Sequence, residues 1–129
     1  MPTAVEEMLR WVSPVMAFRR TAQRDLEIRG QEVKEGDRVV IWYASANRDE
    51  EVFLEADRFD VGRQPNDHLG FGIGPHFCLG AHLARLEIRI MFEELLRRLP
   101  DIELDGPVAR LSSKFLSGIK HMPVRFTPE

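Results

Sequence analysis

Apolar residues recur at helical spacing near the start of the chain, at Ala4, Val5, Met8, Leu9 and Val12. Thr3 followed by Glu6 matches a capping box, a pattern that commonly begins a helix. Pro14 cannot continue a helix because it lacks a backbone N–H group. The pattern therefore predicts a helix over residues 3–11.

A second apolar stripe at helical spacing begins in the middle of the chain, at Leu79, Leu83, Leu86 and Ile90. It is followed by two favourable i,i+4 ion pairs, Glu93 with Arg97 and Glu94 with Arg98. Pro100 comes next and stops the helix. We predict a long amphipathic helix that begins near Leu79.

The segment between these helices has the pattern of short strands. Residues 15–22 look extended, and residues 26–29 and 31–33 alternate in polarity on either side of Gly30, as in a hairpin. Residues 38–44 are apolar and rich in β-branched side chains, which favours a buried strand.

The remaining segments are less regular. Ser45 is expected to cap a short helical turn over residues 45–49. Residues 50–69 show no period and predict an irregular loop, while residues 101–104 and 122–126 predict two strands around a segment rich in Ser and Gly. The fold class is therefore mainly α with small β-sheets (α+β).

Composition narrows the possible functions. The 129 residues, 43% of them hydrophobic, suffice for one domain over residues 1–129 with a modest core. A net charge of −3 does not favour nucleic acid as a partner, and no apolar run has the length of a membrane span. A single cysteine fits the reducing cytoplasm, since it allows no internal disulfide.

Residues 71–80, Phe-Gly-Ile-Gly-Pro-His-Phe-Cys-Leu-Gly, hold that cysteine, Cys78, just before the second helix. Unpaired N–H groups and the positive end of the helix dipole favour a thiolate at such a position. Glycines allow the backbone to approach a flat, bulky group closely. Two other interpretations of Cys78 stay open: an inert buried thiol and a redox-sensing thiol.

The pattern F-G-x-G-x-H-x-C-x-G resembles the cysteine-ligand loop of the cytochrome P450 family of haem-thiolate monooxygenases. The resemblance implies that Cys78 is the axial ligand of haem b iron and that its thiolate promotes O–O cleavage. It implies that His76 contacts a haem propionate, that Phe71 shields the sulfur and that the amides of Leu79 and Gly80 tune its basicity. The other residues that it places at the haem are Gly72, Gly74 and Ala84.

The resemblance also gives a structural role to Glu7 and Arg10, which are three residues apart on the first helix. By themselves they predict only a solvated surface ion pair. In the family this pair is buried and is joined by an arginine from a later loop, and Arg58 matches that third member. We therefore expect Glu7, Arg10 and Arg58 to lock the loop behind the haem.

The predicted strand over residues 15–22 passes beside the haem in the family. Arg20, or else Arg19, would then meet a propionate, although arginines in a strand are often simply solvated. The resemblance assigns five residues to the substrate pocket, with core packing as the alternative for each: Met16, Ala17, Phe18, Phe115 and Leu116.

The family obtains electrons from a ferredoxin or a flavin-containing reductase, and it uses O2 and a lipophilic substrate. His82, Arg85 and Arg89 make the second helix basic near its start. We expect Arg85 to contact the redox partner, with an ordinary solvated helix face as the alternative. Residues 42–49 and 118–124 are most similar to bacterial, notably actinobacterial, members that oxidise sterol side chains and branched lipids.

The chain has about a third of the length expected of the family and lacks the long helix that crosses the distal haem face. We therefore expect it to be the C-terminal third of such a protein and to be catalytically incompetent alone. Its unpartnered strand and leucine stripe predict exposed apolar surface and poor solubility. The alternatives are a haem-binding remnant without turnover and a haem-free redox-sensing or interaction module that uses Cys78.

Overall fold

The first helix, α1 (Pro2–Val12), begins and ends close to the predicted bounds in the computed structural model, which describes residues 1–127. The predicted capping box is wrong, because Met1 is the N-cap residue and no side chain caps the helix. Pro2 occupies the first turn, where a missing N–H group costs nothing. Ser13 ends the helix in a left-handed conformation (φ 43°), and its N–H group donates to Leu9 O at 3.1 Å.

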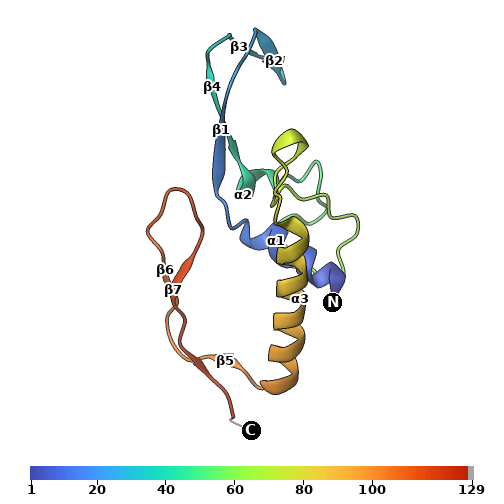
Figure 1. Cartoon of the computed structure of the whole chain (residues 1–129), viewed down its shortest axis with the longest axis vertical. Coiled ribbons are helices and arrows are strands. Elements are labelled where there is room, and N and C mark those ends of the chain that lie inside the picture. The colour runs from blue at the N-terminus through green and yellow to red at the C-terminus, as the bar shows by residue number, and fades with distance from the viewer. Residues whose placement is uncertain (128–129) are drawn as a thin grey trace.

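Two antiparallel pairs of strands follow α1, and the second pair lies between the two strands of the first in the chain (Figure 1). Strand β1 (Ala17–Thr21) pairs with β4 (Arg38–Trp42), so that Phe18 lies opposite Ile41. Strand β2 (Leu26–Ile28) pairs with β3 (Gln31–Val33), which confirms the predicted hairpin around Gly30.

The prediction of a buried strand over residues 38–44 is wrong in two respects. Strand β4 belongs to a two-stranded sheet, and its Val40 and Trp42 side chains are 46% and 55% exposed. The strand ends at Trp42 because Tyr43 begins a short helix, α2 (Tyr43–Ala46), whose N-cap is Trp42 rather than Ser45. The Tyr43 side chain turns inward and is buried.

An irregular segment then leads to the long helix. Residues 50–69 contain turns and bends but neither helix nor strand, as predicted. A short 3-10 turn, η1 (Gly74–His76), precedes α3 (Ala81–Arg98), which begins two residues after Leu79. The predicted leucine stripe of α3 is exposed in the described chain, from Leu79 at 100% to Leu86 at 44%.

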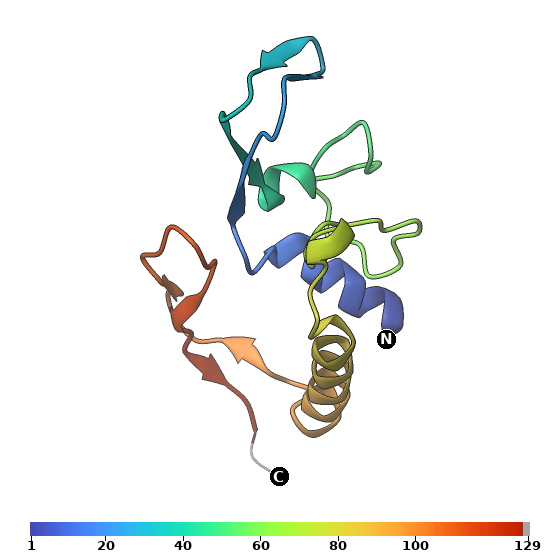
Figure 2. The ribbon, with the colours of Figure 1, turned by 45° about the horizontal axis from the view of Figure 1, so that its top comes forward.

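The C-terminal segment contains four short strands where two were predicted (Figure 2). Strand β5 (Glu103–Leu104) pairs with β8 (Val124–Arg125), and β6 (Ala109–Arg110) pairs with β7 (Ile119–His121). The loop between β6 and β7 reaches back to the residues before β1. There the Met16 N–H group donates to Phe115 O at 2.9 Å, and the Ser117 N–H group donates to Pro14 O at 2.8 Å.

The buried core is small and partly polar. Its apolar members are Val5, Leu9, Ala22, Tyr43, Phe53, Ala56 and Ala81. The largest fully buried side chains, however, are polar or charged, namely Arg10, Glu7, Asn47 and Ser13. Within residues 1–127 no helix has both the length and the apolar character needed to cross a membrane.

Candidate functional site

A cavity of about 440 Å³ lies between the residues around β1 and the loop that carries Cys78. Its walls are largely apolar and include Leu9, Val15 and Phe18. Cys78 belongs to the lining, as do the basic side chains of Arg20 and His76. An apolar cavity with a few polar groups at its boundary is the usual form of a cofactor or ligand site.

The cysteine loop is closed on itself by backbone hydrogen bonds. The Cys78 N–H group donates to Phe71 O at 2.9 Å, and the Gly72 N–H group donates to Leu69 O at 2.8 Å. The Phe77 N–H group donates to Gly74 O at 3.0 Å, which forms the turn η1. The Phe71 and Phe77 rings meet edge to face inside this loop. The sulfur is therefore presented by a fixed backbone.

The backbone conformation at positions 72 and 74 favours glycine. Their φ angles are 72° and 70°, in the left-handed region that side-chain-bearing residues rarely adopt. A Cβ atom at Gly72 would also lie 3.4 Å from the Tyr43 hydroxyl oxygen. The loop thus needs both glycines in order to turn toward the cavity.

The Cys78 thiol is free and exposed. It lies three residues before the first residue of α3, and its own carbonyl accepts the Ala81 N–H group at 3.2 Å. No acceptor among residues 1–127 receives the N–H groups of Leu79 or Gly80. These two amides can therefore donate hydrogen bonds to a thiolate at Cys78, as expected at a helix N-terminus.

These features fit a haem better than a bare metal ion. Within the described residues, no group of three or more His, Cys, Asp or Glu side chains could hold an ion. One thiolate suits a metal that brings its other ligands in a macrocycle. The apolar walls suit the body of such a macrocycle, and Arg20 and His76 suit its carboxylates.

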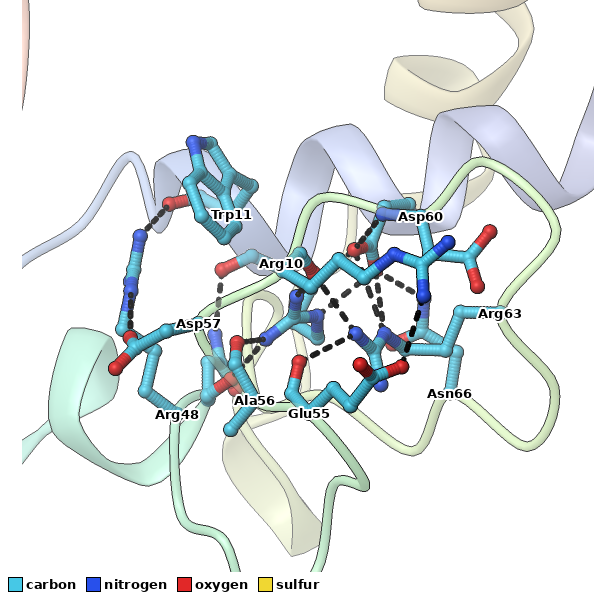
Figure 3. Close-up of polar contacts among 12 residues, drawn as sticks. Arg10, Trp11, Arg48, Glu55, Ala56, Asp57, Asp60, Arg63 and Asn66 are labelled. Atoms are coloured by element: carbon cyan, nitrogen blue, oxygen red, sulfur yellow. Dashed lines mark hydrogen bonds and ion pairs between the residues drawn. The ribbon is translucent and has the colours of Figure 1, made fainter.

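Behind the cysteine loop, Glu7 and Arg10 form a buried ion pair, and both side chains are 0% exposed. Figure 3 shows Arg10 within this network of polar contacts, together with Ala56 and Arg63. The Arg10 Nε and Nη2 groups donate to the two Glu7 carboxylate oxygens at 2.8 Å each. Its remaining N–H groups donate to the carbonyl oxygens of Asn47, Ala56 and Arg58. All five donors of Arg10 are thus used, which is the arrangement in which a buried guanidinium is tolerated.

The prediction that Arg58 completes this pair is wrong, because Arg63 takes that place. Arg63 Nε lies 3.2 Å from Glu7 Oε2, and the Arg63 side chain is 8% exposed. The Arg58 side chain points to solvent and pairs with Glu55 at 2.9 Å. Arg58 contributes only its carbonyl oxygen, which accepts hydrogen bonds from both Arg10 and Arg63.

The network holds Glu7 in its ionised form. Burial raises the pKa of this carboxyl, but hydrogen bonds from Arg10 and the Asp60 N–H group, with the nearby Arg63 charge, outweigh burial. The net effect lowers the pKa of Glu7 from 4.5 to about 2.

Asn47, which the sequence pattern placed in an ordinary turn, links the network to the cysteine loop. Its Oδ1 atom accepts the Leu69 N–H group at 2.7 Å, and its Nδ2 group donates to Ser13 Oγ at 2.9 Å. No spacing rule identifies Asn47 or Arg63, because their partners are far apart in sequence. The only hint was that Arg63 shares the irregular loop with Arg58.

Arg85, predicted to face a redox partner, is engaged inside the chain. Its Nε and Nη2 groups donate to the two Glu6 carboxylate oxygens at 2.7 and 2.8 Å. Its guanidinium carbon lies 4.6 Å from the centre of the Phe71 ring. Glu6, which the sequence pattern assigns to a capping box, is therefore the ion-pair partner of Arg85 on α3. The exposed basic side chains near the start of α3 are His82 and Arg89.

The other predicted site residues divide into two groups. Cys78, His76, Phe71, Gly72, Arg20 and Phe18 line the cavity together. Eight residues do not line it: Gly74, Leu79, Gly80, Ala84, Met16, Ala17, Phe115 and Leu116. Phe115 nevertheless meets Phe18 edge to face at 5.6 Å, so the late loop touches the cavity wall from outside. Tyr43, which lines the cavity, was missed because it was assigned to a strand.

Comparison with known proteins gives consistent matches. The family model described as "Cytochrome P450" matches residues 1–114. Cytochrome P450-terp of a Pseudomonas species is 55% identical over 98% of this chain and 29% of its own length. A methyl-branched lipid omega-hydroxylase of Mycobacterium tuberculosis is 54% identical over 98% of this chain and 30% of its own length.

Solved structures agree with the sequence matches. A Bacillus megaterium cytochrome P450 in complex with testosterone has a TM-score of 0.93 and 41% identity, over 98% of this chain and 36% of its own. A Mycobacterium marinum cytochrome P450 in complex with pseudoionone has a TM-score of 0.92 and 51% identity, over 96% of this chain and 30% of its own. The chain therefore spans about a third of the length of the relatives that it matches.

Proposed function

This chain belongs to the cytochrome P450 family, and we propose that it is the C-terminal, haem-ligand segment of a monooxygenase acting on a lipophilic substrate. One observation carries the proposal. The free Cys78 thiol lines an apolar cavity at the N-terminus of α3, in a loop that requires glycine at positions 72 and 74.

Several residues of this chain would each bind a different part of haem b. Cys78 supplies the thiolate ligand, and the free amides of Leu79 and Gly80 stabilise its charge. Arg20 and His76 donate to the propionates, and Gly72 allows close approach of the backbone. When bound, a thiolate-ligated haem supplies the chemistry that activates O2 and places one of its oxygen atoms in a C–H bond.

The cavity and the names of two relatives support a proposal for the substrate class. Phe18 presents an apolar wall to the cavity, and Phe115 packs against Phe18. One relative is named a methyl-branched lipid omega-hydroxylase and another, from Mycolicibacterium smegmatis, a steroid C26-monooxygenase. We propose a sterol side chain or a branched lipid as the substrate.

Electrons would come from a ferredoxin or a flavin-containing reductase in the cytoplasm. Because Arg85 is paired with Glu6, the exposed basic side chains of His82 and Arg89 are better placed to meet an acidic partner. Replacing Arg89 with Gln should weaken partner binding at low salt more than at high salt.

The decisive experiment is a visible spectrum of the protein with haem, reduced under carbon monoxide, for the wild type beside Cys78→Ala. A red-shifted Soret band that requires Cys78 supports the proposal. Because the thiol is exposed, a haem-free redox-sensing role is the second candidate. Failure to take up haem, together with rapid reaction of Cys78 with thiol reagents, would favour that role, and the same failure in a protein that includes the distal half would contradict haem ligation.

A further inference from the structure

Three charged or polar side chains from different parts of the chain meet behind the cysteine loop. Glu6 comes from α1, Arg85 from α3, and His68 from the loop between them. The Glu6 carboxylate accepts two hydrogen bonds from Arg85 and lies 3.1 Å from His68 Nε2. We call Glu6, His68 and Arg85 the rear cluster. None of the three lines the cavity that Cys78 faces.

Hydrogen bonding determines which ring nitrogen of His68 carries the proton. Its Nδ1 atom accepts the Gly70 N–H group at 3.0 Å, so in the neutral ring Nε2 carries the proton and donates it to Glu6. The His68 side chain is 2% exposed. Burial lowers the pKa of His68, although the hydrogen bond to Glu6 opposes this. The neutral ring is therefore the form that connects α1 to the loop at neutral pH.

The rear cluster holds Phe71 in two ways. The Arg85 guanidinium stacks over the Phe71 ring, 4.6 Å from its centre, and the bidentate pair with Glu6 fixes the plane of that guanidinium. His68 binds the amide of Gly70, the residue directly before Phe71. Both the ring of Phe71 and the backbone leading to it are thus tied to α1 and α3.

Phe71 in turn fixes Cys78. The Phe71 carbonyl accepts the Cys78 N–H group at 2.9 Å, and both residues line the cavity. A continuous series of contacts therefore runs from the rear cluster to the backbone of the thiol. The cluster also contributes a positive and a negative charge close to the loop, in a partly buried setting where charges are incompletely screened.

We propose that Glu6, His68 and Arg85 are positioning residues that fix Phe71 and, through its carbonyl, Cys78, and that the opposite charges of Glu6 and Arg85 set the reduction potential of the metal bound there. The inference rests on the proposed function, because it requires a metal at Cys78. A cation near a redox centre stabilises its reduced state, and an anion destabilises it.

The test is the ferric/ferrous midpoint potential of the haem-loaded protein. Arg85→Met should lower the potential, Glu6→Gln should raise it, and Arg85→Lys should return it toward the wild-type value. A merely structural role would move Arg85→Met and Glu6→Gln in the same direction, since both break the same ion pair. Shifts in the same direction, or none, would overturn the inference.

Matched controls lie on the same helix. Glu94 and Arg98 form an exposed ion pair near the far end of α3. Glu94→Gln and Arg98→Met make the same changes of charge without touching the cysteine loop, and both should leave the potential unchanged. If the controls shift it as much as the rear-cluster variants do, no special role for the cluster remains.

A second measurement does not use the metal. In His68→Leu the Gly70 amide loses its acceptor, so hydrogen exchange at the Gly70 and Cys78 amides should accelerate roughly tenfold, the effect of losing about one hydrogen bond. The Leu99 amide, which donates to Leu95 O, should keep its rate. Equal acceleration at all three amides, or none at Cys78, would overturn the positioning role. The wild-type carbon monoxide spectrum tests the proposed function independently.

Discussion

Glu7 is a carboxylate without solvent contact that faces two guanidinium groups, those of Arg10 and Arg63. A buried charge is tolerated only when it is paired and its hydrogen-bonding groups are satisfied. Glu7 meets this condition through both arginines, the Asp60 N–H group and the Asn66 side-chain amide. The network fastens α1 to the irregular loop, and Asn47 extends it to the residues before Cys78.

Arg63→Met should destabilise the fold by about 3–5 kcal/mol, because it removes one partner from a buried charged network. Arg58→Met should change the unfolding free energy by less than about 1 kcal/mol, since the Arg58 side chain forms only an exposed ion pair with Glu55. Urea unfolding of the two variants measures the difference. Equal losses in both would contradict the assignment of Arg63 as the partner of Glu7.

The depressed pKa of Glu7 gives a second residue-scale prediction. Because its folded pKa of about 2 lies below the ordinary 4.5, its stabilising effect is complete above pH 4.5 and is lost as the pH falls toward 2. The gap corresponds to about 3 kcal/mol of unfolding free energy. Unfolding measured between pH 5 and pH 2 should show this loss in the wild type, whereas Glu7→Gln should be less stable at pH 5 and lack that part of the slope.

At the scale of elements, the two ends of α1 are stabilised differently. No side chain caps its start, whereas at its end the Ser13 hydroxyl donates to Arg10 O and accepts a hydrogen bond from Asn47. The C-terminal end is thus the one that is fixed to the rest of the molecule.

Two substitutions compare these ends. Thr3→Ala should change stability by less than about 0.5 kcal/mol, because no cap is lost. Ser13→Ala should cost about 1–3 kcal/mol, because it leaves buried polar groups on Arg10 and Asn47 without their partner. Thermal unfolding of both variants measures these changes in stability. A large effect of Thr3→Ala would support a capping box at the start of α1.

At the scale of the whole molecule, apolar side chains of α3 are exposed in the described chain. Leu83 is 60% exposed and Met91 is 62% exposed, and Leu79 is fully exposed just before the helix. Contiguous apolar surface of this kind promotes association in water.

The 129-residue chain by itself should therefore self-associate as its concentration rises, which sedimentation velocity would detect. Leu83→Glu should reduce association more than Leu54→Glu, a control at an equally apolar loop residue that is 84% exposed. A stable, soluble monomer of the unmodified chain would contradict this expectation.

The features that depend on neighbouring residues could be predicted from the amino-acid sequence. The Cys78 loop, the long helix after it and the hairpin at Gly30 follow from glycine positions, apolar periodicity and turn residues within short windows. The family could be identified for the same reason, because its most specific pattern lies within ten consecutive residues.

The pairing of charges that are distant in sequence, in contrast, depends on how the elements pack. Several arginines had the chemistry to meet Glu7 or Glu6, and the irregular loop has no period that fixes which side chain points inward. The Tyr43 side chain is buried among residues that are distant from it in sequence. Arg63 rather than Arg58 pairs with Glu7, and Arg85 pairs with Glu6, because these pairs neutralise carboxylates that are wholly or partly buried. That requirement exists only once the elements have packed, because exposed side chains in an unfolded chain are satisfied by water.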